Sequence, residues 1–195
     1  MARDRQPVLK KCRNLGLDPS VLGVNKKSNR NIRPNANRKL TEYGTQMREK
    51  QKARFVYGVM EKQFYKLYEE ATRKEGVTGE LLLQYLERRL DNVIYRLGFG
   101  ATRRQARQIV SHGHILINGK RVNIASYRVK QGDVITVKED SKELALIKES
   151  VGQKTVPGWL SLEEGALTAK VLENPGRDAV DFEVDEAMII EFYSR

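Results

Sequence analysis

The sequence predicts an α+β fold: a helical domain with an inserted domain of two arginine-rich helices packed on a small, mainly antiparallel β-sheet, plus a basic N-terminal extension. Three observations support this fold class. Apolar residues recur at three- and four-residue steps early in the chain, two short amphipathic arginine-rich patterns follow, and an Asn-Gly turn then separates two apolar runs. The expected parts are a basic arm (1–44), a helical domain (45–90) completed by a C-terminal segment (179–195), and an inserted domain (91–178) whose arginine-helix motif spans 86–137.

The N-terminal arm is basic and poor in apolar side chains. Residues 25–39 contain five Asn, six Lys or Arg, one Pro and a single large aliphatic residue, Ile32. Such a stretch buries too little surface to offset its ordering entropy, so it is either a disordered tail or an arm that orders against RNA. Before it, a short packed turn or helix is expected from the apolar residues Leu15, Leu17, Val21 and Leu22.

The helical domain is predicted to hold one long helix, over about 45–74, and a shorter one. Gly76 is expected to end the long helix, and Thr78 is placed to cap the next. The apolar C-terminal segment 187–193 is expected to close against these helices. The stripe of the long helix is interpreted as core rather than as a ligand groove, and consists of Phe55, Val56, Val59, Met60, Phe64, Leu67, Tyr68 and Ala71.

Turn and cap residues mark the elements of the inserted domain. Gly98 and Gly113 are expected to end its two helices, and Thr102 followed by Gln105 forms a capping-box pattern at the start of the second. Asn-Gly at 118–119 predicts a two-residue hairpin, because both turn positions need positive φ. The strands are expected at 114–117, 120–123 and 134–137.

Both arginine-rich patterns place cations on one side and apolar residues on the other. At about 100° per residue, the cationic arcs hold Arg88, Arg89, Asn92 and Arg96 in the first helix and Arg103, Arg104, Arg107 and Ser111 in the second. Their six arginines have no acid between them, although Asp91 at the edge of the first arc is placed to orient an arginine. A merely solvated face would mix both signs, so the pattern favours one guanidinium surface that faces a phosphate backbone.

Charge is distributed unevenly along the chain. The net charge of +11 divides into +11 for residues 1–75, +7 for 76–138 and −7 for 139–195. A polyanion should therefore lie against the first two thirds, while the acidic end faces solvent, a basic partner or the protein's own cations. The expected RNA contacts are Arg88, Arg89, Arg96, Arg103, Arg104, Arg107 and Lys120 in the arginine motif, and Arg30, Arg33, Arg38, Lys39, Arg48, Lys52 and Arg54 before it.

Several other classes of protein are disfavoured. A lone Cys12 gives neither an internal disulfide nor a cysteine zinc cluster, and His112 and His114 lack a third ligand at short spacing, so no metal or cofactor is expected. Walker, hydrolase-elbow and phosphate-loop motifs are absent from the sequence, which argues against an enzyme. Without an apolar run of 18 residues or a leader pattern, we expect a cytoplasmic protein that does not enter a membrane.

A known family shares these motifs. The segments Leu-Glu-Arg-Arg-Leu-Asp-Asn, Ala-Thr-Arg-Arg-Gln-Ala-Arg, His-Gly-His and Ile-Asn-Gly-Lys resemble the RNA-binding module named after the fourth protein of the bacterial small ribosomal subunit. The module alone would imply RNA binding and little more, because it also occurs in pseudouridine synthases and a ribosome-rescue factor. Flanking segments, such as the run that starts at Thr41, Pro157-Gly158-Trp159-Leu160 and the terminal Glu-Phe-Tyr-Ser-Arg, extend the resemblance to the whole ribosomal protein.

The resemblance implies a structural component of the small subunit. Family members bind 16S ribosomal RNA at a junction in its 5′ domain, nucleate assembly of the 30S body, contact ribosomal protein five, affect decoding accuracy with proteins five and twelve, and lie near the path by which messenger RNA enters. Some relatives hold zinc with four N-terminal cysteines. This chain keeps only Cys12, so zinc is not expected. The alternatives left open are an RNA-modifying enzyme or rescue factor with the same module, and a scaffold that binds proteins through its acidic end.

Overall fold

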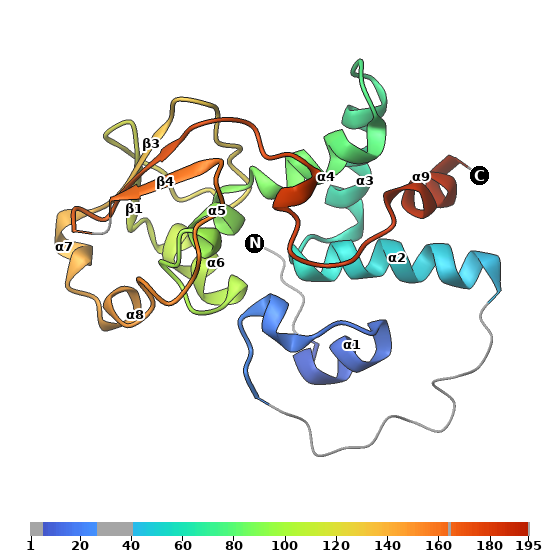
Figure 1. The fold of residues 1–195 in the computed structure, drawn as a ribbon, viewed down its shortest axis with the longest axis horizontal. Helices are drawn as coiled ribbons and strands as arrows, with labels where there is room; N and C mark the ends of the chain where they lie inside the picture. Colours follow the sequence, from blue (N-terminus) through green and yellow to red (C-terminus); the bar gives the residue numbers. More distant parts are fainter. Residues whose placement is uncertain (1–5, 27–40, 164, 195) are drawn as a thin grey trace. The chain divides into compact units, whose positions relative to one another are not determined.

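The computed structural model describes residues 6–26, 41–163 and 165–194, and the chain forms two compact units (Figure 1). Unit 1 consists of residues 1–83 and 181–195, and unit 2 of residues 84–180. Helices occur in both units and unit 2 also contains a five-stranded antiparallel sheet, so the predicted α+β class is confirmed. The predicted limits of the arm, the helical domain and the inserted domain stay predictions.

Unit 1 is helical over its described residues. Thr41 caps its longest helix, since the Thr41 Oγ1 accepts a hydrogen bond from the Gly44 N–H at 3.2 Å. The predicted packed segment around Leu15–Leu22 is confirmed as a helix and a 3-10 turn. The elements are α1 (Val8–Leu15), the 3-10 turn η1 (Pro19–Leu22), α2 (Glu42–Val56), α3 (Glu61–Thr72), the start of α4 (Thr78–Glu87) and α9 (Glu186–Ser194).

The prediction of one long helix over residues 45–74 is wrong. The chain leaves the helical path after Val56 and resumes it at Glu61. Gly58 has a φ of 62°, a left-handed conformation that glycine adopts without the penalty of a Cβ. The break lets Val59, which is 3% exposed, point into the core, so the apolar spacing continues across the break and imitates one helix.

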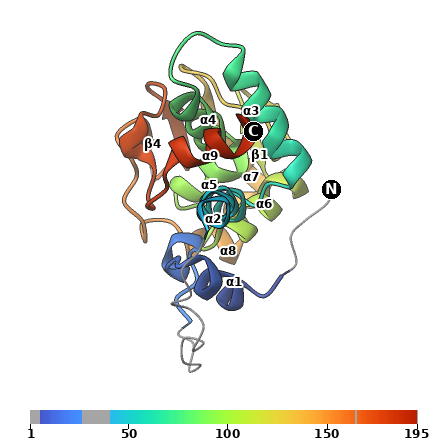
Figure 2. The ribbon, with the colours of Figure 1, turned by 90° about the vertical axis from the view of Figure 1, so that its right-hand side faces the viewer.

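Aromatic packing joins the C-terminal helix to the other helices of unit 1. Figure 2 shows α9 beside α2 and α3. Phe64 of α3 is fully buried, and its ring centroid lies 6.2 Å from that of Tyr193 on α9. On α2, the ring of Tyr43 lies 5.4 Å from that of Phe192. These contacts explain the apolar side chains of segment 187–193.

Unit 2 combines the two arginine-rich helices with the sheet. Figure 1 shows α5 and α6 next to the strands, and the apolar residues of both helices share one core cluster with the buried residues of the sheet. The strands pair in the order β2-β1-β3-β5-β4, with every pair antiparallel. The elements are α5 (Leu90–Arg96), α6 (Arg103–His112), β1 (Ile115–Ile117), β2 (Lys120–Arg121), β3 (Val134–Val137), α7 (Glu139–Lys142), α8 (Ala145–Lys148), β4 (Leu160–Glu163), β5 (Thr168–Val171) and the 3-10 turn η3 (Arg177–Ala179).

The predicted hairpin is confirmed, and its turn is fixed by a side-chain pair. Asn118 and Gly119 have φ values of 49° and 76°, as a two-residue turn with two positive φ angles requires. The Asn118 amide donates to Asp133 at 2.9 Å and accepts from the Val134 N–H at 2.9 Å, which ties the turn to the start of β3. Strands β4 and β5 were not predicted. Among the described residues, no helix is long and apolar enough to span a lipid bilayer.

Candidate nucleic-acid interface

The first arginine-rich helix is shorter than the sequence pattern indicated. Arg89 has a ψ of 134°, precedes α5 as its N-cap, and forms an isolated antiparallel bridge with Arg128. Backbone bonds from Leu90 N to Tyr127 O at 2.8 Å and from Val129 N to Arg88 O at 3.0 Å hold this extended step. The helical wheel that placed Arg88 and Arg89 on one arc with Arg96 is therefore wrong, because the chain is not helical at Arg89.

The second arginine-rich helix has the predicted ends. The Thr102 Oγ1 accepts from the Gln105 N–H at 3.1 Å, and the Gln105 side chain accepts from the Ala101 N–H at 2.8 Å, one residue before the expected cap. Gly113 ends α6 with a φ of 77°. Gly100 allows the preceding loop to lie against the helix, since a Cβ there would be 2.8 Å from the Ala106 nitrogen. These capping contacts fix the two ends of α6 and therefore the positions of its arginines along the helix.

One buried carboxylate gathers polar groups at the start of the motif. Glu87 is fully buried, and its two oxygens accept from Arg96 at 2.8 and 3.1 Å. One of these oxygens also accepts from the Asn92 amide at 2.8 Å. The side-chain carbonyl of Asn92 in turn accepts a hydrogen bond from the Arg103 guanidinium of α6, and Arg103 is only 8% exposed. Glu87 and Asn92 thereby link the arginines of both helices.

A second buried carboxylate holds two further arginines. Asp91 is 5% exposed and accepts a bidentate pair of hydrogen bonds from Arg89, at 3.1 and 2.8 Å. Arg107 of α6 lies against the same carboxylate, with 3.5 Å between its Nη1 and the Asp91 Oδ2. The Asp91 Oδ1 also accepts from the Asn92 N–H at 3.0 Å, so both carboxylates belong to one network.

The expectation that Asp91 orients an arginine is confirmed by its two hydrogen bonds from Arg89, whereas the presence of Glu87 among the arginines was not predicted. In the contacts described, three guanidinium groups meet the two carboxylates and a fourth binds the Asn92 side chain. The predicted contact residues of the motif occupy three environments, namely buried for Arg89 and Arg103, half-buried for Arg88, Arg96 and Arg107, and exposed for Arg104 and Lys120. Their role as RNA contacts stays a prediction.

The contact residues predicted before the motif fall into two groups. Those in α2 are half-buried: Lys52 pairs with Glu49 at 2.6 Å, and Arg54 pairs with Glu61 at 2.8 Å. Arg48 reaches the end of α1, where its guanidinium would lie 3.2 Å from a Cβ added at Gly16. The others lie outside the described residues, and they are Arg30, Arg33, Arg38 and Lys39.

Lys154 is a residue of this region that the sequence analysis missed. Its Nζ donates to the carbonyls of Gly100 and Ala101 at 2.8 and 3.1 Å, so it fixes the loop that precedes α6. The same ammonium lies 3.4 Å from the ring centroid of Tyr95, and the Arg103 guanidinium lies 4.4 Å from it. No local pattern signals this role, because Lys154 is more than 50 residues from the loop that it binds.

The two histidines lie at the end of α6 among other cations. A hydrogen bond of 2.9 Å links the His114 Nδ1 to the Ser141 hydroxyl, and the His112 carbonyl accepts from Arg121 at 3.2 Å. Burial lowers the pKa of His114, and the charges of His112, Arg121 and Lys138 lower it further. Within the described ranges, no group of three or more His, Cys, Asp or Glu residues is placed to hold a metal ion.

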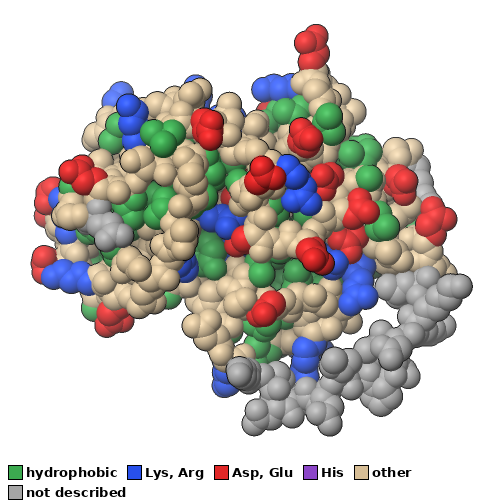
Figure 3. Space-filling view, in the orientation of Figure 1, with side chains coloured by type: hydrophobic (Ala, Val, Ile, Leu, Met, Phe, Trp, Pro, Cys, Tyr) green, Lys and Arg blue, Asp and Glu red, His purple; other side chains and the backbone are tan. Residues whose placement is uncertain are grey.

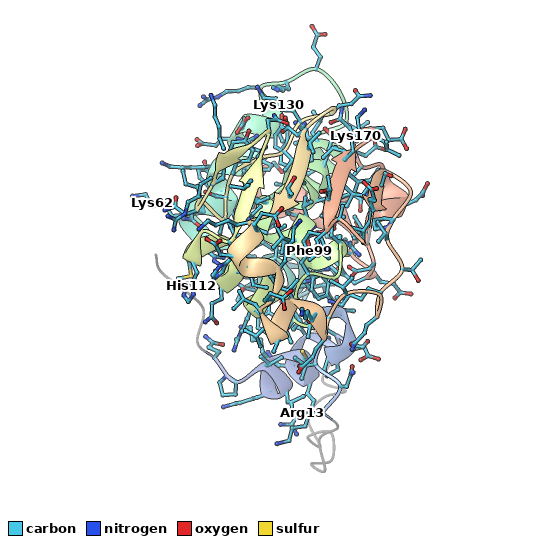
Figure 4. All side chains as sticks on the ribbon, turned by 90° about the vertical axis from the view of Figure 1, so that its left-hand side faces the viewer. Arg13, Lys62, Phe99, His112, Lys130 and Lys170 are labelled. Atoms are coloured by element: carbon cyan, nitrogen blue, oxygen red, sulfur yellow. The ribbon has the colours of Figure 1, made fainter. Side chains whose placement is uncertain are left out.

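On the face drawn in Figure 3, basic and acidic side chains are interspersed over the described surface. In unit 2, Figure 4 places the exposed residues Lys130 and Lys170 toward one end of the sheet and His112 toward the other. Partial burial and the nearby charge of Arg128 lower the pKa of Arg88, so two guanidinium groups are held close together there. Such like-charged pairs suit an anionic ligand that lies between or across them.

The chain is similar to known proteins over its whole length. The sequence matches the model of the S4 domain over residues 88–135 and that of the ribosomal protein S4/S9 N-terminal domain over residues 3–87. The protein is thus of the RNA-binding S4-domain class. It is 67% identical over 195 residues to small ribosomal subunit protein uS4 of Fusobacterium nucleatum, and 54% identical over 199 residues to that of Lachnoclostridium phytofermentans, with the full length of each chain covered. The chain belongs to the uS4 family of small ribosomal subunit proteins. This is a family of ribosomal proteins and not a family of enzymes.

Proposed function

We propose that this protein is a structural component of the small ribosomal subunit in the bacterial cytoplasm and binds 16S ribosomal RNA directly, in the 5′ domain. The observation that carries the proposal is the network in which three guanidinium groups contact two buried carboxylates and a fourth binds the Asn92 side chain. The network lies in a domain of the RNA-binding class. Closely spaced phosphates of a folded RNA junction suit guanidinium groups that are held this close together.

Finer parts of the proposal rest on the family. As a primary binding protein, the chain would nucleate assembly of the 30S body, and with ribosomal proteins five and twelve it would contribute to translational accuracy. Contacts with protein five and with messenger RNA near its path into the subunit belong to the same proposal. The alternative of an RNA-modifying enzyme or rescue factor is disfavoured, because the relatives that match the full chain are named small ribosomal subunit proteins.

The direct test is a footprint of the purified full-length protein on a naked 16S transcript. We expect protection confined to the 5′ domain. Protection elsewhere, or none without other ribosomal proteins, would contradict primary binding at that site. The same titration at several salt concentrations should show affinity falling by about 0.7–0.9 log units per tenfold salt for each phosphate that the protein neutralises.

Exposed cations provide the matched variants. Arg104→Ala combined with Lys120→Ala should weaken binding and lower the salt slope by about 0.7–0.9 for each phosphate that is no longer neutralised. Lys142→Ala combined with Lys148→Ala removes the same charge from α7 and α8, where both lysines pair with neighbouring glutamates. An equal loss of affinity in both double variants would mean that net charge, rather than the arginine motif, determines binding.

A further inference from the structure

Asp91 is a buried acid among arginines that we propose to bind RNA. Its carboxylate is 5% exposed and contacts the guanidinium groups of Arg89 and Arg107, which come from different elements of unit 2. By charge alone, a carboxylate here opposes RNA binding through its repulsion of phosphate. Burial adds a desolvation cost, so its presence needs an explanation other than net charge.

The geometry around Asp91 supplies that explanation. Arg89 binds it through two hydrogen bonds in the fork arrangement that fixes a guanidinium plane. The Arg107 Nη1 lies 3.5 Å from Oδ2, an oxygen that Arg89 also contacts. The Arg107 side chain is 11% exposed, so much of its rotamer freedom is already lost before RNA arrives. A side chain that is ordered in advance binds with a smaller entropy loss.

We propose that Asp91 is a positioning residue for RNA binding, which holds Arg107 of α6 in the orientation that contacts a phosphate. This inference rests on the proposed function, because it refines how the same surface recognises RNA. Asp91 does not touch the RNA itself. Its negative charge slightly weakens the long-range attraction between the protein and RNA. It stabilises the bound state by more, because Arg107 is already ordered and loses less entropy on binding.

Asp91→Asn tests the inference because positioning and charge predict opposite signs. If charge alone matters, loss of an acid tightens binding to the 5′-domain transcript. If Asp91 positions Arg107, binding weakens about three- to tenfold, as expected when a long side chain must be ordered on binding. Asp140→Asn is the matched control, because it removes the same charge from an exposed side chain that pairs with Lys138 in the same unit. It should leave binding unchanged or slightly tighter.

A double-mutant cycle with Arg107→Gln identifies the residue through which Asp91 acts. The loss of affinity caused by Asp91→Asn should vanish in the Arg107→Gln background, and an undiminished loss there would overturn the inference. Equal or tighter binding by a folded Asp91→Asn protein would overturn it too. Wild-type protein that fails to bind the transcript would instead overturn the proposed function.

Arg107→Lys keeps the test decisive if Asp91→Asn proves too unstable to titrate. It retains the charge and leaves Asp91 unchanged, but it removes the planar fork. We expect weaker binding with an unchanged salt slope, because a point charge replaces an oriented guanidinium. Binding equal to that of the wild type would show that orientation at position 107 is irrelevant and would overturn the inference.

Discussion

Each unit contains a carboxylate that holds several donors, but the two carboxylates lie at different depths. In unit 1, Glu61 accepts from Lys50 at 2.7 Å, Arg54 at 2.8 Å and the Tyr193 hydroxyl at 2.7 Å, and its side chain is 42% exposed. In unit 2, Glu87 is fully buried. Water screens the first group and can replace a missing partner, whereas it does not reach the second. Similar local chemistry should therefore contribute very differently to stability.

The largest expected effect comes from removing each carboxylate in turn. Glu87→Ala removes a fully buried carboxylate that accepts from both Arg96 and Asn92, and should lower the free energy of unfolding by about 3–5 kcal/mol. Glu61→Ala should cost less, about 1 kcal/mol, because the Glu61 side chain is 42% exposed and water screens its ion pairs, although Lys50 is buried. Urea unfolding would be followed by the fluorescence of Trp159, the sole tryptophan, for unit 2 and by circular dichroism for the helices.

A surface pair calibrates this comparison. Glu143 pairs with Lys148 and both side chains are more than half exposed, so Glu143→Ala should change stability by less than about 0.5 kcal/mol. Equal losses of stability for Glu87→Ala and Glu61→Ala would contradict the view that depth decides the contribution.

Lys154 provides the next largest effect. Lys154→Ala removes two hydrogen bonds to loop carbonyls and a cation–π contact with Tyr95, and should cost about 1.5–3 kcal/mol. Lys148→Ala is the matched control, with an expected change near zero. Since the loop leads into α6, Lys154→Ala should also weaken RNA binding. A stability equal to that of the control would show that the loop does not need this anchor.

Local signals in the sequence predicted local structure well. The Asn118-Gly119 turn and the caps at Thr102 and Gly113 are confirmed, because each depends on residues within a few positions. The break at Gly58 was missed because the core spacing continues through it. The break at Arg89 was missed because its cause, the bridge to Arg128, lies 39 residues away.

The polar network was the least predictable part of the site. Arginine counts and arcs indicated a cationic surface, but the sequence does not show which guanidinium groups bind internal acceptors. Arg96 also donates to the carbonyl of Ala179 at 2.7 Å, a contact across 83 positions. No local pattern identifies the Glu87 carboxylate as the partner of Arg96, which lies nine residues further along the chain. Such assignments depend on tertiary packing and not on periodicity.

A smaller effect is the acid dependence of unit 1. Burial acts to raise the pKa of Glu61, but hydrogen bonds from Lys50, Tyr193 and Arg54 outweigh it and lower that pKa below 4.5. A depressed pKa contributes stability above the unfolded value, and this stability is lost as pH falls through the folded value. The stability difference between wild type and Glu61→Gln should therefore shrink below about pH 4.5. A constant difference in urea midpoints between pH 6 and pH 3 would contradict this.

The smallest expected effect is the pH dependence of the stability of unit 2. Here too stability should fall as pH falls, but the titrating group is the base His114. The pKa of His114 lies below 6.5, because burial and the charges of His112, Arg121 and Lys138 all oppose its protonation, and Asp140 is engaged by Lys138. The folded state therefore binds fewer protons than the unfolded chain, so stability decreases as pH falls through 6.5 toward the folded value. His114→Gln should remove part of this decrease in the melting temperature reported by Trp159 fluorescence between pH 7.5 and pH 5.5. An identical pH dependence of the melting temperature in wild type and His114→Gln would mean that protonation of His114 does not contribute to the loss of stability at low pH.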